Sequence, residues 1–477
     1  MISARHYIAT YNETGLSHYD GNPLIESLPA IFSEIDVVRM LGAIPPLPSE
    51  SELELEPKLR SHCVSRLKDI VVPLDIHLQL EDGFSQLLRY GYTARNPFTV
   101  AGRKFTNASE PPRGFKSSAD IMTLIGLSGM GKTTALDAIT KNYPQVILHK
   151  EYKGQIFIQT QVVWLKIDCP HDGSLRGFCS AFFAALDNAL GIDKYFAFGA
   201  GRYSISVMLQ KISQLCKTYF VGALIIDEMQ HLNSSRGGID REKLLNFFVT
   251  LSNDAGVPLV YVGTNAMLPL FSGVVRNARR AVGLGEITFD RYIYGDPFWD
   301  HLVDCFWKYT WVGKPTPISD ELREIIYDLS QGNTDFLVKL LTLAQRHAIW
   351  ERAERVTPQI LKHVFDNQMR MLHKPIQALR SRDPQQIADF EDMMPTKDQV
   401  IRMMNYDLVR SAKRADFALF STPALDEKAV SIKPPDGKPA VAVQHNPDLG
   451  RKVYIDQSAN VQSELIERGW VDKDPVW

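Results

Sequence analysis

Cysteine is scarce in this sequence. The 477 residues include 5 cysteines, which are widely scattered, and an odd number of cysteines suits a reducing compartment. Cys169-Pro-His171 together with Cys179 offers ligand types for a metal site. No second C-x-x-C pair accompanies them, so buried structural thiols are the favoured interpretation.

Long apolar runs are also missing. No stretch approaches the roughly 18–20 consecutive apolar residues that a membrane-spanning helix needs. Residues 1–7 lack the basic and then apolar layout of a secretory signal. We therefore expect a cytoplasmic protein that makes no contact with a membrane.

An excess of charge of either sign is absent as well. Lysine and arginine number 53 and aspartate and glutamate 55, which gives a net charge of −2 and an isoelectric point of about 6.6. This balance excludes a globally basic nucleic-acid-binding protein. Any DNA contact must come from a local patch or from the combined surface of an oligomer. The hydrophobic content of 45% is ordinary for a globular protein, and the length favours two or three domains.

A glycine-rich loop lies between an apolar run and a stretch of helical character. The run covers 121–125, the loop reads Gly126-Leu-Ser-Gly-Met-Gly-Lys132-Thr133, and a helix-compatible stretch covers 135–140. A strand, G-x-x-x-x-G-K-T and a helix form the pattern of a P-loop, whose backbone N–H groups surround a β-phosphate. Lys132 would reach the β- and γ-phosphates, and the Thr133 hydroxyl would bind Mg²⁺. The sequence therefore predicts a nucleoside triphosphate site formed by Gly126, Ser128, Gly129, Met130, Gly131, Lys132, Thr133 and Thr134.

An acidic pair ends a second apolar run. Residues 223–226 (Ala-Leu-Ile-Ile) predict a buried strand that leads to Asp227 and Glu228. Asp227 would complete the Mg²⁺ shell, and Glu228 would orient or deprotonate a water that attacks the γ-phosphate. A positioned water favours hydrolysis over transfer of the phosphate, so the pair predicts an ATPase.

Two further segments carry candidate catalytic residues. The apolar run 258–262 leads to Thr264 and Asn265, which either contact the γ-phosphate or the attacking water or simply form a turn that closes a strand. Arg276, Arg279 and Arg280 share one face of a predicted helix. They form a solvated basic face, or one of them reaches the γ-phosphate of a neighbouring subunit as an arginine finger.

Apolar runs alternate with helical stretches from Ile121 onward. Strands are predicted at 121–125, 161–167, 222–226, 258–262 and 287–289. This alternation favours an α/β fold whose five-stranded, mainly parallel sheet is covered on both faces. Beyond residue 300 only helices are predicted: one opened by Ser319, one capped by Thr334 and one begun by Thr357-Pro358. The expected parts are an N-terminal extension or small domain (1–115), the α/β core (116–298), a helical lid (299–378) and a C-terminal basic helix and tail that docks partners (379–477).

These motifs together resemble TnsC, the AAA+ regulator ATPase of transposons, of which TniB and MuB are more distant relatives. The resemblance covers about residues 1–380. Its most specific part is the run Asp227-Glu-Met-Gln-His-Leu232, and it also includes the loop 126–134, Leu165–Leu175, Leu245–Val249 and Gly263-Thr264.

The resemblance implies a P-loop NTPase of the AAA+ class that uses ATP and Mg²⁺ in a bacterial cytoplasm. It implies homo-oligomers, rings or filaments, on duplex DNA that link a target-selection protein (TniQ/TnsD-like) to transposase subunits (TnsA/TnsB-like), with hydrolysis driving disassembly. Residues 126–134 match the Walker A segment, Asp227 and Glu228 match Walker B, and Thr264, beside Asn265, matches a polar sensor. Arg276, Arg279 and Arg280 match the finger region. Asp335 stands near the position where many AAA+ lids carry a second sensor arginine, so slow, switch-like hydrolysis is expected.

The candidate DNA surface is the loop after the second core strand. His171, Ser174 and Arg176 supply a cation and small hydrogen-bonding groups, and Lys166 is a further candidate. The alternative is a helix capped by Ser174 with a solvated Arg176. Two other functions stay open: an initiator or helicase-loader AAA+ ATPase, and a signalling scaffold that binds nucleotide without turnover.

Overall fold

The computed structural model describes residues 6–42, 45–108, 116–234, 239–272 and 285–381, and a few residues between 383 and 404. All of them belong to the first of two compact units, Met1–Val409 and Arg410–Trp477. The basic segment of residues 400–420 falls almost entirely outside the described residues. None of the described helices is long and apolar enough to cross a membrane.

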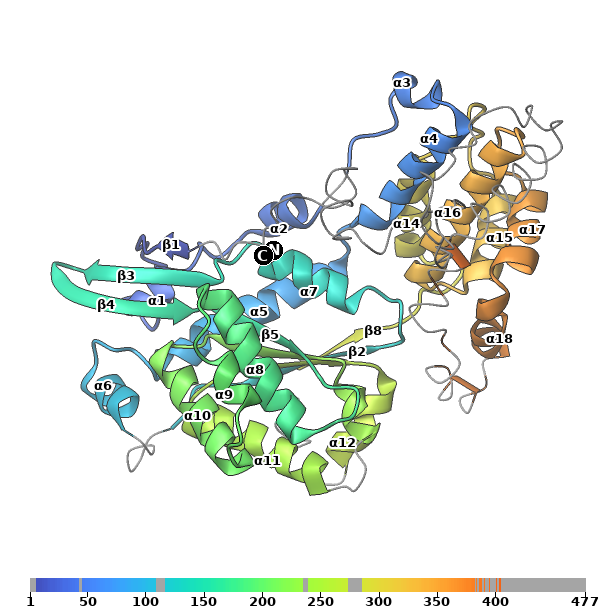
Figure 1. Cartoon of the computed structure of the whole chain (residues 1–477). Coiled ribbons are helices and arrows are strands. Elements are labelled where there is room, and N and C mark those ends of the chain that lie inside the picture. Colours follow the sequence, from blue (N-terminus) through green and yellow to red (C-terminus); the bar gives the residue numbers. More distant parts are fainter. Residues whose placement is uncertain are drawn as a thin grey trace, which may run out of the picture. The chain divides into compact units, whose positions relative to one another are not determined.

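A five-stranded parallel sheet forms the centre of this unit (Figure 1). The strand order is β5-β6-β7-β2-β8, and each strand runs parallel to its neighbours. All residues of β2, β6 and β7 are buried, as parallel strands covered on both faces should be. The predicted α/β fold with a five-stranded sheet is therefore confirmed, with the strands at Ile121–Gly126 (β2), Trp164–Asp168 (β5), Ala223–Asp227 (β6), Leu259–Gly263 (β7) and Glu286–Phe289 (β8).

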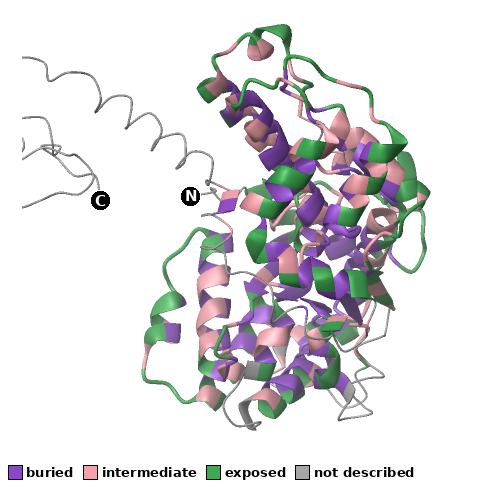
Figure 2. Cartoon of the chain, turned by 90° about the vertical axis from the view of Figure 1, so that its right-hand side faces the viewer, coloured by how far each residue is buried: buried purple, intermediate pink, exposed green. Residues whose placement is uncertain are grey.

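Two hydrophobic clusters cover the two faces of this sheet. Because side chains alternate along a strand, Met122 and Leu124 belong to one cluster and Ile121 and Ile125 to the other. Figure 2 shows the buried residues concentrated in the central strands and on the inner sides of the helices. The first cluster includes α5 (Asp75–Thr93) and α7 (Lys132–Thr140), and the second includes α8 (Leu175–Leu190), α10 (Ile205–Thr218) and α11 (Ile239–Asp254).

A second, three-stranded sheet was not predicted. It has the order β1-β3-β4 and consists of His6–Ile8 (β1), Val146–Tyr152 (β3) and Gln155–Val162 (β4). The hairpin between β3 and β4 turns at Lys153 and Gly154, which both have positive φ, at 48° and 75°. The prediction of one strand over 161–167 was wrong, because β4 ends at Val162 and β5 begins at Trp164.

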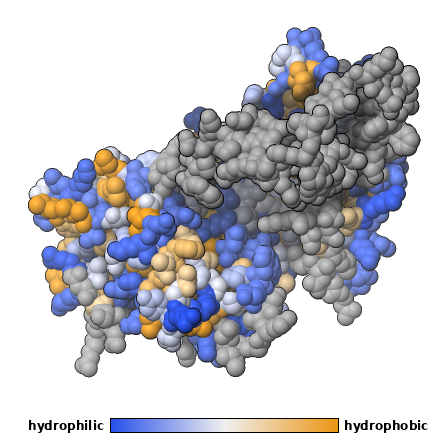
Figure 3. Space-filling model, viewed as in Figure 1, coloured by the Kyte–Doolittle hydropathy of each residue, from blue (hydrophilic) through white to orange (hydrophobic). Residues whose placement is uncertain are grey.

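The outer strand of this hairpin, β4, is uncharged and exposes two isoleucines. Ile156 and Ile158 on β4 are 85% and 77% exposed. Hydrophobic surface is visible at the left of Figure 3, the side on which Figure 1 places the hairpin. Edge strands usually carry charge that prevents pairing with other chains, and β4 has none.

The helical lid contains five helices among the described residues. Ser319 and Thr357-Pro358 begin α15 and α17 as predicted. The prediction that Thr334 caps a helix was wrong: Asn333 is the N-cap of α16, and its Oδ1 accepts from Phe336 N at 3.2 Å. The helices are α14 (Pro297–Trp307), α15 (Asp320–Ser330), α16 (Thr334–Trp350), α17 (Pro358–Gln368) and α18 (His373–Ser381).

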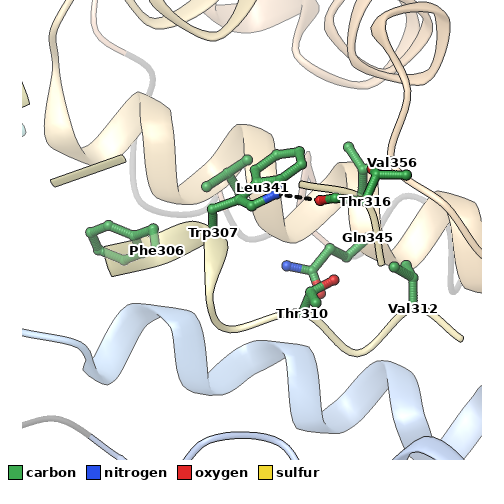
Figure 4. A pocket seen from close by; sticks show the side chains of 8 residues that line it. All are labelled: Phe306, Trp307, Thr310, Val312, Thr316, Leu341, Gln345 and Val356. Atoms are coloured by element: carbon green, nitrogen blue, oxygen red, sulfur yellow. Dashed lines mark hydrogen bonds between the residues drawn. The ribbon is translucent and has the colours of Figure 1, made fainter. Parts of the chain in front are cut away.

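A small hollow lies inside the lid. Figure 4 shows its lining, where Trp307 Nε1 donates to Thr316 O at 2.9 Å beside Leu341 and Gln345. Its volume of about 10 Å³ is about that of one water probe. The hollow is a packing gap between helices and has no room for a ligand.

The N-terminal residues pack on both the core and the lid. Helix α5 contacts β2 and β8, and α4 (Pro57–Cys63) contacts α16. Arg60 pairs with Glu354, whose other carboxylate oxygen accepts from Gly313 N at 2.7 Å. The other α-helices of this N-terminal segment are α1 (Pro23–Glu26), α2 (Glu34–Leu41), α3 (Glu50–Leu53) and α6 (Val100–Asn107).

The division of the chain into four parts stays a prediction.

We expect Glu354→Ala to destabilise the protein by about 2–4 kcal/mol, because it leaves the Arg60 guanidinium buried without its partner. Urea denaturation followed by tryptophan fluorescence measures the change. Asp328→Ala is the matched control: it breaks the exposed pair with Arg380 and should cost about 1 kcal/mol or less. Equal losses of stability for the two variants would contradict the idea that the buried Arg60–Glu354 pair holds the N-terminal segment on the lid.

Candidate functional site

The glycine-rich loop joins β2 to α7 at the carboxyl end of the sheet. Gly126 has φ +151°, and a Cβ atom there would lie 2.2 Å from Phe289 O, so only glycine fits beside β8. Gly131 caps the N-terminus of α7 in a left-handed conformation. The loop therefore presents backbone N–H groups at a helix start, which is where anions bind.

Lys132, Thr133 and Asp227 come together next to this loop. The Lys132 side chain is buried, and its Nζ donates to Gly126 O at 2.8 Å and to Leu127 O at 2.9 Å. Thr133 Oγ1 donates to Asp227 Oδ2 at 3.0 Å, and Asp227 is 3% exposed. A hydroxyl and a carboxylate that converge in this way are the oxygen ligands that Mg²⁺ prefers, so the residues fit the metal.

Lys166 also lies at Asp227. Its Nζ is 2.7 Å from Asp137 Oδ1 and 3.3 Å from Asp227 Oδ2. Burial disfavours the charge of this ammonium group, but the two carboxylates outweigh that effect and raise the pKa of Lys166. Lys166 and Asp227 therefore form a charge pair beside Thr133, and this pair was not predicted from the sequence.

The other candidate catalytic residues occupy the turns after β6 and β7. Glu228 is exposed, has φ +56° and donates its N–H to Asp227 Oδ1 at 2.9 Å. Thr264 is buried, and its Oγ1 has no hydrogen-bond partner among the described residues, whereas Asn265 is exposed. Gln230 connects these turns, since it bonds to both Glu228 and Thr264. Arg276, Arg279 and Arg280 lie outside the described residues.

A cavity of about 270 Å³ opens beside the loop. Met130 and Thr134 form one side, residues of the segment 68–77 form another, and the lid forms the third. A largely apolar wall of this size suits a nucleobase. The apolar residues of this wall are Ile70, Val71, Val72, Leu74, Tyr292 and Val338. The wall was not predicted from the sequence, where the only signal for it was the short apolar run before α5.

The lid contacts the glycine-rich loop directly. Asn333 Nδ2 donates to Ser128 O at 2.8 Å, and Asp335 N donates to Gly129 O at 3.0 Å. A Cβ atom on Gly129 would lie 2.8 Å from Asn333 Oδ1, so this contact also requires glycine. The Asp335 carboxylate pairs with Lys339. The sequence predicted that the lid lacks a sensor arginine here. In its place, two neutral donors, the Asn333 amide and the Asp335 N–H, bind the loop.

The candidate DNA residues make contacts within the chain. His171 Nδ1 lies 3.1 Å from His231 Nε2. Ser174 is the N-cap of α8 and accepts from Gly177 N. Arg176 donates to Gly201 O and Tyr203 O at 3.3 and 2.7 Å. These contacts agree with the alternative of a capped helix, and the assignment of a DNA surface to this loop stays a prediction.

The cysteines form no metal centre in the described part of the chain. All five thiols are free, and no group of three or more His, Cys, Asp or Glu side chains among the described residues is arranged to hold a metal ion. Cys169 and Cys179 are buried, and burial raises the pKa of each thiol to about 12. Both thiols are therefore buried as expected, and their purely structural role stays a prediction.

Comparisons with known proteins support an ATPase-type core. None of the curated proteins matches the sequence. Among solved structures the chain is similar to the Walker-type ATPase PABY2304 of Pyrococcus abyssi (14% identity, 71% of this chain and 89% of that chain, TM-score 0.36). It is also similar to Cdc6p from Pyrobaculum aerophilum (16% identity, 73% of this chain and 89% of that chain, TM-score 0.39). A third similar structure is Drosophila ORC bound to DNA (14% identity, 79% of this chain and 90% of that chain, TM-score 0.36). The scores are low, so the assignment depends on the sheet and on the match of residues 115–271 to the family model described as AAA domain. Residues 115–271 are thus similar to an AAA domain, and the chain has the P-loop AAA+ fold.

Proposed function

We propose that this chain is an ATP-dependent regulator of DNA transposition that binds ATP with Mg²⁺ beside the P-loop and hydrolyses it. One observation carries the nucleotide site: Lys132, Thr133 and Asp227 converge at the carboxyl edge of the parallel sheet. The start of α7 and the cavity beside it provide complementary places for the phosphates and the base.

Each residue has a separate task in the proposed reaction. Lys132 and the loop N–H groups bind the β- and γ-phosphates, and Thr133 and Asp227 hold Mg²⁺, which neutralises charge that develops on the phosphates. Glu228 accepts a proton from the attacking water. The buried, unpartnered hydroxyl of Thr264 contacts the γ-phosphate or that water.

The proposed biological role is assembly on duplex DNA. ATP between subunits favours a ring or filament because the γ-phosphate binds the assembled state better, and one of the arginines at 276–280 supplies the contact from the neighbour. The oligomer links a target-selection protein to the transposase, and hydrolysis promotes disassembly. A net charge of −2 per subunit suits this arrangement, since DNA contact then depends on a surface that subunits repeat. The Asp227–Leu232 run, which carries the resemblance to TnsC, supports this role.

Lys132→Ala should abolish nucleotide-dependent assembly on DNA, because it removes the cation that binds the β- and γ-phosphates. Binding of a fluorescent ATP analogue and electron microscopy with duplex DNA measure the two steps. Lys141→Ala, at the exposed C-cap of α7, is the control and should behave as the wild type. Undiminished assembly of the Lys132 variant would contradict the site assignment.

Glu228→Gln should retain ATP binding and lower the rate of hydrolysis by about 10²-fold or more, because the amide cannot accept the proton of the water. Complexes with DNA should then persist, since hydrolysis drives their disassembly. Phosphate release and the lifetime of the DNA complexes are measured together. Rapid turnover by this variant would show that another group activates the water.

Lys166→Met should lower the Mg²⁺ concentration needed for ATP binding by about fivefold, the equivalent of about 1 kcal/mol. The ammonium group lies on the Asp227 oxygen that Thr133 also contacts, so it competes with the metal for that carboxylate. Asp137→Asn should have the opposite effect, because it removes the other partner of Lys166. Fluorescence titration with Mg²⁺, and with chelator as control, measures both. Identical metal dependence in all three proteins would refute the competition.

The proposed role in transposition is tested by loading the protein with ATP on duplex DNA and identifying the proteins that bind to this complex. Capture of transposase subunits supports it, and capture of a replicative helicase would instead indicate an initiator or loader. Tight nucleotide binding with no phosphate release, with or without DNA, would indicate a scaffold.

A further inference from the structure

Gln230 joins the two turns that carry Glu228 and Thr264. Its Nε2 donates to Glu228 Oε2, and its Oε1 accepts from Thr264 N at 3.2 Å. Glu228 follows β6 and Thr264 follows β7, which are neighbouring strands. One side chain therefore connects the ends of two parallel strands at the edge of the sheet where the P-loop lies.

A primary amide satisfies both partners, because it donates through its nitrogen and accepts through its oxygen. A carboxylate can accept but not donate, and a backbone N–H can donate but not accept. The opposite orientation of the amide would place oxygen against oxygen and N–H against N–H, so the chemistry of the partners determines the orientation. Glutamate at position 230 would retain the contact with Thr264 and repel Glu228.

The connection is tightly packed. A Cβ atom on Gly263 would lie 2.8 Å from Gln230 Oε1 and 2.6 Å from Met267 Sδ, so a larger residue there would displace the amide from β7. Glu228 has φ +56°, a backbone conformation that costs a non-glycine residue energy and persists where neighbours enforce it. The position of Glu228 is therefore imposed by its surroundings.

Thr264 lies at the other end of this connection, in the turn after β7, where the proposed function places the γ-phosphate or the attacking water. Its hydroxyl is buried without a partner, while its N–H is occupied by Gln230. A displacement of Thr264 toward a phosphate moves the Gln230 acceptor and, through the same amide, the Glu228 carboxylate. Gln230 donates to Oε2 of that carboxylate, so Oε1 is the oxygen that would accept a proton from the attacking water in the proposed reaction.

We propose that Gln230 is a positioning residue for ATP hydrolysis that aims the Glu228 carboxylate and couples it to Thr264. The inference depends on the proposed ATPase function. In the reaction the water oxygen bonds to the γ-phosphorus and the water's proton passes to Glu228 Oε1. The bond from that phosphorus to the β,γ-bridging oxygen breaks, and ADP leaves with the electron pair.

Gln230→Met tests the proposal, because methionine is similar in size and makes neither bond. With duplex DNA present, kcat should fall by about ten- to a hundredfold, the effect of misplacing a catalytic group, while the Kd for a fluorescent ATP analogue stays unchanged. An unchanged or higher kcat would overturn the proposal. Gln230→Glu, which retains the bond from Thr264, should show the same loss and serves if the methionine variant does not fold.

A double-mutant cycle separates positioning from general structural damage. If Gln230 acts through Glu228, adding Gln230→Met to Glu228→Gln should lower kcat no further. A full additional loss in that background would overturn the proposal. If the wild-type protein releases no phosphate at all, the proposed ATPase function is wrong. That result differs from normal wild-type turnover that Gln230→Met does not lower, which would contradict only the role proposed for Gln230.

Asn233→Ala is the matched control. Asn233 Nδ2 donates to Ala266 O at 2.5 Å, so it joins the same two turns without contacting Glu228. Its kcat should equal that of the wild type. A loss as large as that of Gln230→Met would mean that loosening the turns is sufficient, and would overturn the specific role of the amide.

Discussion

The buried carboxylate of Asp227 is the constraint on which the site depends. It is 3% exposed, and a charge this deeply buried needs partners to offset the loss of water. The Thr133 hydroxyl, the Glu228 N–H and the Lys166 ammonium supply them. The start of α7, the turn after β6 and the neighbouring strand β5 are thereby held around one group.

The parallel sheet brings these partners to one edge. The register pairs Asp168 with Asp227 and Ile125 with Gly263, so the strands end level with one another. A slip of one residue would turn the apolar side chains of β2, β6 and β7 to the opposite face, where a different cluster packs. The two hydrophobic cores therefore determine the register, and the register places the acidic pair beside the P-loop.

The elements predicted correctly from the sequence are those that depend on residues close together in the chain. The strands β2, β6 and β7 were found because each is a mostly apolar run with clear ends, and the glycine-rich loop was found from its own motif. The run across Val162 and Trp164 was misread because its division depends on distant bonds, from Val162 N to Tyr219 O and from Val163 N to Gln145 O. The cap of α16 went to Asn333 rather than Thr334, and the side chain of Asn333 also bonds to Ser128 O, a contact no local pattern contains.

The lid illustrates the same limit and has a mechanistic consequence. The sequence indicated that Asp335 cannot act as a sensor arginine, but not that its N–H and the Asn333 amide bind the carbonyls of Gly129 and Ser128. These donors are neutral and are directed at the backbone, so they respond to the shape of the loop and not to the charge of a γ-phosphate. In the proposed mechanism, detection of that charge falls to the core. Thr264 is suited to this task because its free hydroxyl and its bonded N–H join the phosphate position to Glu228 through Gln230.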